Sequence, residues 1–230
     1  MERLVLFDID GTLLSTDGAA ARAFRTALED VFGTSGPVSG YSFAGRTDPQ
    51  IARDLLTMAG IEPEQITEGL TAVWPLYERL LDEELRSTEV TRYAGVLELL
   101  DRIRPAEDRV LNGLLTGNIA GGARLKLEWA GIGFDRFRVG AFGSDHADRR
   151  ELPAIAVSRA AGAVGHRFDG KSVVIIGDTP LDIACGEHLG VRTIAVATGS
   201  YTRAELLACG PDHAFEDLSD TEAVLAAILD

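Results

Sequence analysis

Acidic side chains follow two short apolar runs of the sequence, each at the point where the run ends. Asp8 and Asp10 follow the first run, near the N-terminus, and Asp178 and Asp182 follow a run late in the chain. Carboxylates gathered in one place repel each other and are costly to bury unless a cation neutralises them. Oxygen ligands without histidine or thiolate favour a hard divalent ion, with Mg2+ as the first choice. The pattern therefore predicts a magnesium site, provided that the two runs end side by side.

The spacing of Asp8 and Asp10 suits a nucleophile with a neighbouring acid. If strand geometry persists beyond the run, residues two apart project to the same side. A metal-bound carboxylate stays ionised and can attack an electrophile, whereas a neighbour with a raised pKa can protonate a leaving group. Gly11 then allows a sharp exit from the strand. Both aspartates are therefore candidates for catalysis.

A third polar group follows another apolar run, at 110–115. Thr116 offers a hydroxyl, and the Gly117 and Asn118 amides offer donors for phosphate oxygens at the predicted start of a helix. Each of these motifs alone is more often a turn or a helix cap. Their joint occurrence at successive strand ends is hard to produce by chance, so we interpret them as parts of one site.

Apolar runs alternate with amphipathic segments through most of the chain, and this alternation predicts the fold class. Residues 173–176 are apolar at every position, which is typical of a central parallel strand buried on both faces. We expect an α/β fold with a doubly wound, Rossmann-like, mostly parallel sheet. Ligands of such sheets bind beyond the carboxyl ends of the strands, where the polar groups should meet. The predicted strands are residues 4–7, 110–115, 138–142, 172–176, 193–196 and 213–215, and the predicted helices are 95–104, 121–130, 152–161 and 180–189.

Residues 16–86 break this alternation, because they show only helical patterns, interrupted by turn-forming residues at 33–37 and 60–63. We therefore expect an all-helical cap domain over 16–86. It would be inserted into an α/β core domain formed by 1–15 and 87–230.

The overall composition excludes several classes of protein. Hydrophobic residues make up 46% and charged residues 25% of the 230 residues, as in ordinary soluble domains. The net charge of −14 argues against a nucleic-acid partner. Cys185 and Cys209 lack metal-ligand spacing, and no signal-peptide layout or membrane-length apolar run is evident. We expect a cytoplasmic protein with no membrane partner, either a monomer or a homodimer.

Taken together, these motifs resemble the haloacid dehalogenase superfamily, in particular its phosphatase branch. The chain looks like the group of phosphoglycolate phosphatases and β-phosphoglucomutases that carries a helical cap after the first strand. FDIDGTLL at 7–14, LLTGN at 114–118 and IIGDTPLDI at 175–183 match the first, second and fourth motifs. The similarity spans nearly the whole chain.

The resemblance implies a role for each acidic residue. Asp8 would be the nucleophile and Asp10 the general acid and base. Asp8, the backbone carbonyl of Asp10 and Asp178 would hold Mg2+, and Thr116 would bind the transferring phosphoryl group. Asp182 would stand behind the ligands and orient water or a neighbouring side chain.

The third motif departs from the family pattern, which places a lysine there. The chain has two lysines, Lys126 and Lys171, and neither lies in that part of the sequence. Arg149 aligns best with the expected lysine, and Arg150 is the fallback. An arginine can supply the same charge to the nucleophile and phosphate with bidentate geometry. The alternative is that both are surface arginines near the next helix.

The segment 44–49 resembles the cap loop that faces the active site in this group. Thr47 and Asp48 are expected to cap a helix that begins near Pro49. Neither capping nor packing requires Arg46. It is therefore a candidate for binding a carboxylate or distal phosphate of the substrate.

We predict a Mg2+-dependent phosphomonoester hydrolase that acts on a small phosphorylated metabolite through an aspartyl-phosphate intermediate. By resemblance only, phosphoglycolate is the first substrate to consider. A sugar phosphomutase of the β-phosphoglucomutase type is the runner-up, but the expected cap histidine is absent from residues 15–21. A non-catalytic binding module remains the alternative from another class, because a fold alone does not fix activity.

Overall fold

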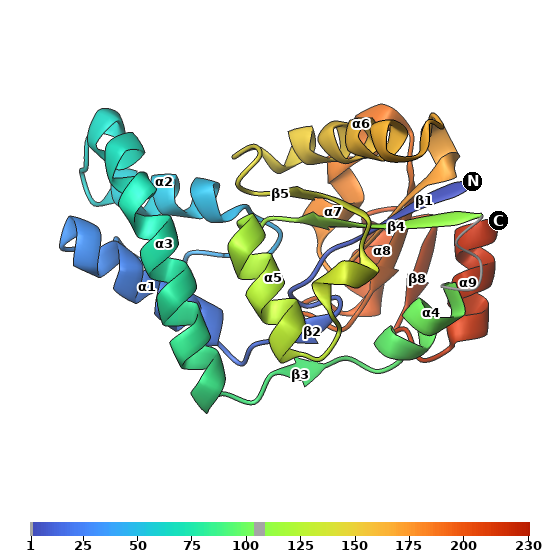
Figure 1. The fold of residues 1–230 in the computed structure, drawn as a ribbon, viewed down its shortest axis with the longest axis horizontal. Helices are drawn as coiled ribbons and strands as arrows, with labels where there is room; N and C mark the ends of the chain where they lie inside the picture. The colour runs from blue at the N-terminus through green and yellow to red at the C-terminus, as the bar shows by residue number, and fades with distance from the viewer. Residues whose placement is uncertain (1, 104–108) are drawn as a thin grey trace.

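The computed structural model describes residues 2–103 and 109–230, and a six-stranded sheet forms its centre (Figure 1). The strands are β1 (Arg3–Phe7), β4 (Val110–Thr116), β5 (Val139–Phe142), β6 (Val173–Gly177), β7 (Arg192–Val196) and β8 (His213–Phe215). They are parallel and lie in the order β5-β4-β1-β6-β7-β8. The predicted α/β fold is confirmed, and each predicted strand lies within one residue of its observed bounds.

The register of the sheet brings three polar motifs together. Phe7, the last residue of β1, pairs with Leu114 of β4 on one side and with Ile176 of β6 on the other. The segments that follow these three strands therefore emerge side by side. This edge of the sheet is where ligands of open α/β folds bind.

Helices cover both faces of the sheet because the strands are apolar on both sides. Val5 and Phe7 of β1 belong to one hydrophobic cluster, and the alternate residues Leu4 and Leu6 belong to another. The first face is covered by α4 (Val96–Ile103), α5 (Ala120–Trp129) and α9 (Thr221–Leu229), and the second by α6 (Leu152–Val164) and α7 (Pro180–Cys185). In Figure 1, α6 lies above the sheet and α4 and α9 below it.

Some helices differ from the prediction. The helix predicted at 180–189 ends at Cys185, and a separate 3-10 turn, η5, follows at Glu187–Leu189. Gly186 separates them; a Cβ there would lie 2.4 Å from Val191, so the backbone packs directly on its neighbour. The prediction of one continuous helix was wrong. The sequence reasoning also missed α8 (Arg203–Ala208) and α9. The predicted helix 95–104 is observed to Ile103, and Arg104 lies outside the described residues.

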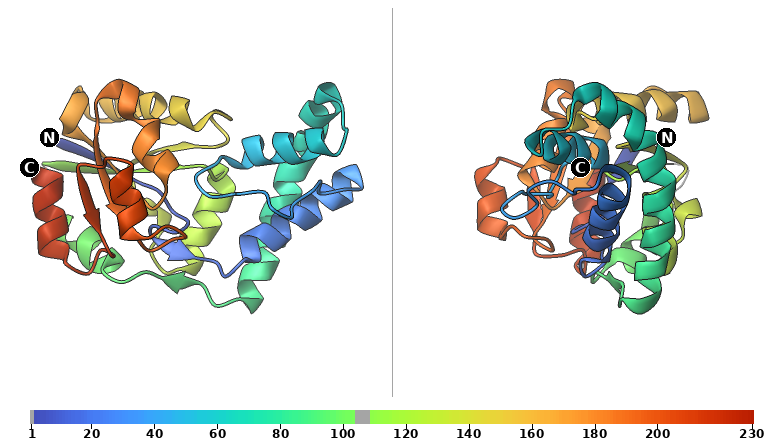
Figure 2. Two further views of the ribbon diagram at one scale, coloured as in Figure 1. Left: turned by 180° about the vertical axis from the view of Figure 1, so that it is seen from behind. Right: turned by 90° about the vertical axis from the view of Figure 1, so that its left-hand side faces the viewer.

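Three helices form a lobe beyond the carboxyl edge of the sheet (Figure 2). They are α1 (Ala19–Phe32), α2 (Asp48–Met58) and α3 (Pro63–Ser87), and residues 19–87 are called the helical lobe below. The lobe has a hydrophobic cluster of its own, in which Phe24 packs against Trp74 and Tyr77. Two short antiparallel strands, β2 (Leu14–Ser15) and β3 (Thr91–Arg92), pair where the chain leaves and rejoins the sheet region. None of the helices described is both long and apolar enough to cross a membrane.

Candidate active site

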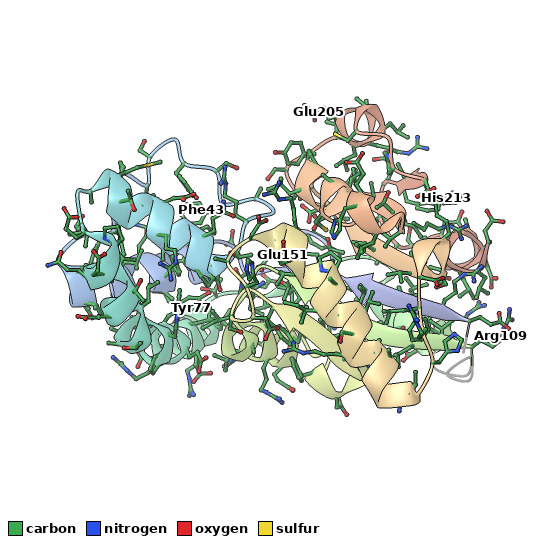
Figure 3. The ribbon with its side chains drawn as sticks, turned by 90° about the horizontal axis from the view of Figure 1, so that it is seen from above. Phe43, Tyr77, Arg109, Glu151, Glu205 and His213 are labelled. Carbon is green, nitrogen blue, oxygen red and sulfur yellow. The ribbon has the colours of Figure 1, made fainter. Side chains whose placement is uncertain are left out.

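A cavity of about 560 Å³ lies between the carboxyl edge of the sheet and the helical lobe. Asp8, Thr116 and Asp178 line it from the strand ends, and Tyr77 is among the lobe residues on its wall. Figure 3 shows Tyr77 in the lobe and Glu151 at the start of α6. Glu151 marks the part of the chain that also holds Arg149. Tyr77 is only 1% exposed, so it belongs to the core of the lobe and also borders the cavity.

Three carboxylates form a buried cluster at this edge. Asp8, Asp178 and Asp182 each have an oxygen atom within 4.8 Å of the others. Burial raises the pKa of Asp8 to about 7, although Arg149 opposes this rise. Burial, with repulsion from Asp182 and Asp8, raises the pKa of Asp178 to about 8. The cluster offers only carboxylate oxygens as ligands, and three carboxylates together carry a high negative charge. Such a donor set fits a hard divalent cation.

Arg149 supplies the positive charge beside this cluster. Its Nη2 lies 3.2 Å from Oδ1 of Asp8 and also donates to Oδ1 of Asp182. The guanidinium is buried, and its pKa is raised because the two carboxylates outweigh the opposing effect of burial. Arg150 is exposed and pairs with Asp148 instead. The structure thus brings Arg149 and not Arg150 to Asp8, and the alternative in which both are surface residues is wrong.

Asp182 connects Arg149 to the start of α7. Its Oδ2 accepts hydrogen bonds from the Thr179 amide at 3.0 Å and from the Thr179 hydroxyl at 2.7 Å. The Thr179 hydroxyl in turn accepts from the Asp182 amide, which completes a capping box. Because one carboxylate oxygen caps the helix, the other is held in place to orient the guanidinium beside Asp8.

The carboxylate of Asp178 fits between two glycines. A Cβ at Gly199 would lie 1.8 Å from its Oδ2, and a Cβ at Gly11 would lie 2.3 Å from the same atom. Thr12 donates to Oδ1 of Asp178 at 3.0 Å, and Thr198 donates to the Gly11 carbonyl at 2.5 Å. The sequence reasoning missed Gly199, although it follows the end of β7 and so carries the same strand-end signal as the predicted motifs.

Asp10 makes different contacts from Asp8. β1 ends at Phe7, so the strict alternation of a strand does not reach Asp10. Its carboxylate is 42% exposed and accepts from Lys126 Nζ at 2.7 and 2.8 Å and from Asn118 Nδ2 at 2.7 Å. The carboxylate is thus engaged away from the acidic cluster. Its backbone carbonyl remains the group that the resemblance assigns to the metal.

The second motif forms a tight turn against the helical lobe. Thr116 is fully buried, and its Oγ1 accepts from Nδ2 of Asn118 at 2.7 Å. A Cβ at Gly117 would lie 2.0 Å from the Arg46 carbonyl oxygen, so no larger residue fits there. The Gly117 carbonyl accepts from the Asp48 amide at 2.8 Å. The turn predicted to bind phosphate is therefore shaped partly by the lobe.

Residues at the start of α2 join the lobe to the core. Thr47 caps α2 as predicted, since its hydroxyl accepts from the Gln50 amide, and it also donates to the Ala147 carbonyl at 2.6 Å. Asp48 accepts at 2.8 Å from the amide of Ile119, the residue that precedes α5, so its carboxylate contacts the core rather than capping its own helix. Burial raises the pKa of Asp48 to about 6, although Lys126 opposes the shift.

Arg46 lines the cavity, as expected of a substrate-binding residue. Its Nη1 lies 3.4 Å from Oδ2 of Asp54, and its guanidinium carbon lies 5.3 Å from the centre of the Tyr41 ring. Both contacts are within the lobe and are partly exposed. Arg46 is therefore held at the wall of the cavity by weak partners that an anion can displace.

Lys126 is the site residue that the sequence reasoning missed most clearly. It lies on the buried side of α5 with Ala123 and Leu127. A lysine on an otherwise apolar stripe is the signal that could have revealed it, since a buried ammonium group needs a partner. That partner, Asp10, is far away in sequence.

Comparisons with known proteins agree with this geometry. Residues 151–221, which include Asp178, Asp182 and Gly199, match a family model described as HAD-hydrolase-like. The chain is 27% identical over 220 residues to the pyrophosphatase PpaX of Bacillus velezensis, covering 94% of this chain and 93% of the relative. The chain is thus similar to haloacid dehalogenase-like hydrolases. The predicted resemblance is confirmed, and the matches agree with the predicted class of HAD-like hydrolase.

Solved structures share the fold over the whole chain. A hydrolase from Pseudomonas syringae superposes with a TM-score of 0.73 at 19% identity, covering 100% of both chains. A predicted phosphoglycolate phosphatase from Haemophilus somnus gives a TM-score of 0.69 at 19% identity and covers 98% of both chains. These likenesses establish the architecture in which the cavity is built.

Proposed function

We propose that this hydrolase is a Mg2+-dependent phosphomonoesterase that acts on a small phosphorylated metabolite through a phosphorylated Asp8. The position of Asp8 carries the proposal. Its buried carboxylate lies 3.2 Å from Nη2 of Arg149 on one side and belongs to the acidic cluster with Asp178 on the other. A nucleophile for a phosphate ester needs such cationic surroundings, because nucleophile and substrate are both negatively charged.

The proposed metal ligands are Asp8, Asp178 and the backbone carbonyl of Asp10. When bound, Mg2+ neutralises the acidic cluster and the charge that develops on the phosphate oxygens. The pure oxygen donor set supports this assignment.

Asp8 and Asp10 divide the chemistry between them. Asp8 attacks phosphorus in line, so a bond forms from its carboxylate oxygen while the ester P–O bond breaks. Asp10 gives a proton to the departing alkoxide, which leaves as the alcohol. Asp10 then takes a proton from water, which attacks phosphorus and breaks the bond to Asp8, releasing inorganic phosphate.

Other groups bind the transferring phosphoryl. Arg149 balances charge on its equatorial oxygens and remains tied to Asp182. The Thr116 hydroxyl and the Gly117 and Asn118 amides act as donors to the same oxygens, at the start of α5. Each of these groups lies on the wall of the cavity.

The helical lobe acts as the cap in this proposal, with the cap at 16–86 and the core at 1–15 and 87–230. Its position over the strand ends, and its hydrogen bonds to the second motif, support that role. Arg46 is the proposed contact for a second anionic group of the substrate. The names of a pyrophosphatase relative and of a predicted phosphoglycolate phosphatase both point to substrates with such a group.

The test replaces the nucleophile. We expect Asp8→Asn to reduce hydrolysis of p-nitrophenyl phosphate by at least about a thousandfold, because an amide does not form the covalent intermediate. Wild-type turnover should require Mg2+ and disappear in EDTA. Asp101→Asn, which removes an exposed carboxylate paired with Arg136, is the matched control and should remain active. Wild-type activity in the Asp8 variant, with its fold verified by circular dichroism, would refute the proposal.

A further inference from the structure

Lys126 occupies an unusual position for a lysine. Its side chain is only 4% exposed, and it lies on α5, the helix that begins directly after the second motif. It also lines the cavity. A buried ammonium group is destabilising unless it is fully paired, so its partners show what the residue does.

Lys126 forms a closed set of hydrogen bonds with Asp10 and Asn118. Its Nζ lies 2.8 and 2.7 Å from the two carboxylate oxygens of Asp10 and 2.5 Å from Oδ1 of Asn118. The other end of the Asn118 amide, Nδ2, donates to Oδ2 of Asp10 at 2.7 Å. Both oxygens of the Asp10 carboxylate are therefore engaged, by Lys126 on α5 and by Asn118 in the turn that precedes this helix.

Asp10 needs such support more than the other acidic residues of the site do. It lies beyond the end of β1, and its side chain is 42% exposed, whereas that of Asp8 is 7% exposed. A half-exposed carboxylate on an irregular segment samples several rotamers unless it is held. Small errors in the placement of a proton donor reduce rates strongly.

We infer that Lys126 is a positioning residue, which with Asn118 holds the Asp10 carboxylate where it meets the leaving group. This inference rests on the proposed function, and Lys126 acts through Asp10 rather than on the phosphoryl group. The Lys126 ammonium group pairs with Asp10, just as the Arg149 guanidinium pairs with Asp8. The chain thus assigns one buried cation to each of its two catalytic carboxylates.

A purely electrostatic role is the competing explanation. Lys126 also opposes the rise in the pKa of Asp48, so its charge serves two carboxylates. If charge alone matters, Lys126→Arg should retain the activity of the wild-type protein. If placement matters, Lys126→Arg should remain defective, because the wider guanidinium does not fit the same set of acceptors.

The test compares leaving groups. For a series of aryl and alkyl phosphates, kcat/KM reports the steps up to departure of the alcohol, where Asp10 acts as the acid. We expect Lys126→Met to lower kcat/KM by at least about tenfold for alkyl phosphates, which need a proton donor. The loss should shrink to within about threefold for 2,4-dinitrophenyl phosphate, whose leaving group needs no proton. Lys171→Met is the matched control, because Lys171 is the other lysine of the sequence and also pairs with an aspartate, Asp212. This substitution should change kcat/KM for neither class of substrate.

A double-mutant cycle completes the experiment. In an Asp10→Asn background, Lys126→Met should cause no further loss on alkyl phosphates, because the group that it positions is gone. Equal losses across all leaving groups, additive losses in the cycle, or full recovery by Lys126→Arg would each overturn the inference. If Lys126→Met fails to fold, Lys126→Arg carries the leaving-group comparison. Absence of Mg2+-dependent turnover in the wild-type protein would instead refute the proposed function, and this inference with it.

Discussion

Arg149 contacts two carboxylates at once, and this distinguishes it from the lysine expected at the third motif. One guanidinium nitrogen lies between Asp8 and Asp182, and all three side chains are buried. The planar group is held by Asp182, which is itself fixed by the cap of α7. The nucleophile therefore depends on a chain of contacts that begins at a helix terminus.

We expect Arg149→Met to affect stability as well as activity. Removing the cation leaves Asp8 and Asp182 buried without their partner, which costs about 3 to 5 kcal/mol of folding free energy. Turnover should fall by about 10² to 10³, as when one donor to a transition-state charge is lost. Urea denaturation and phosphate release are the measurements. Arg150→Gln removes an exposed neighbour and should change neither, and a normally stable Arg149→Met protein would contradict the assignment.

At the scale of elements, the site is assembled from the ends of four strands. The predicted motifs follow β1, β4 and β6, and the loop after β7 adds Gly199, whose backbone closes over the Asp178 carboxylate. The backbone of this loop has to approach closely, because there is no room for a side chain between it and Asp178. The loop after β7 thus contributes the close approach of its backbone at Gly199 and the Thr198 hydroxyl, which donates to the Gly11 carbonyl.

Gly199→Ala should therefore damage the metal site. The added Cβ would lie 1.8 Å from Oδ2 of Asp178, so the loop or the carboxylate has to move. We expect the Mg2+ concentration for half-maximal activity to rise at least about tenfold, since the geometry of one ligand is disturbed. Gly162→Ala on α6 is the control: nothing lies within 4 Å of its added Cβ, so activity should be unchanged. Unaltered Mg2+ dependence in the Gly199 variant would show that the loop does not shape this site.

Local patterns were sufficient to predict the sheet and the residues at its strand ends. Residues of β6 are buried on both faces, so an unbroken apolar run marks the strand directly. The start of α8 also had a local signal that was overlooked, a capping box between Thr202 and Glu205. The contacts that Lys126 and Asp48 make in the site were not predictable in the same way. Their partners come from other segments, and only the folded chain brings them together.

At the scale of the whole molecule, the acidic cluster links folding to pH. The pKa of Asp8, about 7, and that of Asp178, about 8, both lie above the ordinary value of 3.8 for an aspartate. Between pH 3.8 and about 7 to 8, the metal-free folded state therefore keeps protons on these two carboxylates that the unfolded chain has already released. The resulting stabilisation is complete below about pH 4 and is lost as the pH rises through 7 to 8.

Thermal unfolding in EDTA should accordingly show a falling Tm from about pH 5 to pH 8.5. Mg2+ should raise Tm more at pH 8 than at pH 5, because it binds the deprotonated cluster. Asp178→Asn removes one of the titrating carboxylates and should flatten both dependences. A Tm that rises over this range in the wild-type protein, without metal, would contradict the electrostatic account.

The hydrogen bond from the Ile119 amide to the Asp48 carboxylate joins the lobe to the core beside the second motif, which affects how a substrate enters the cavity. A swing of the lobe away from the sheet would remove the acceptor of the Ile119 amide, and with it one contact beside the Thr116–Gly117–Asn118 turn. Opening of the lobe to admit a substrate would then also loosen the phosphate-binding turn, and closing of the lobe would restore it. The Asp48 carboxylate thus links the position of the lobe to the shape of that turn.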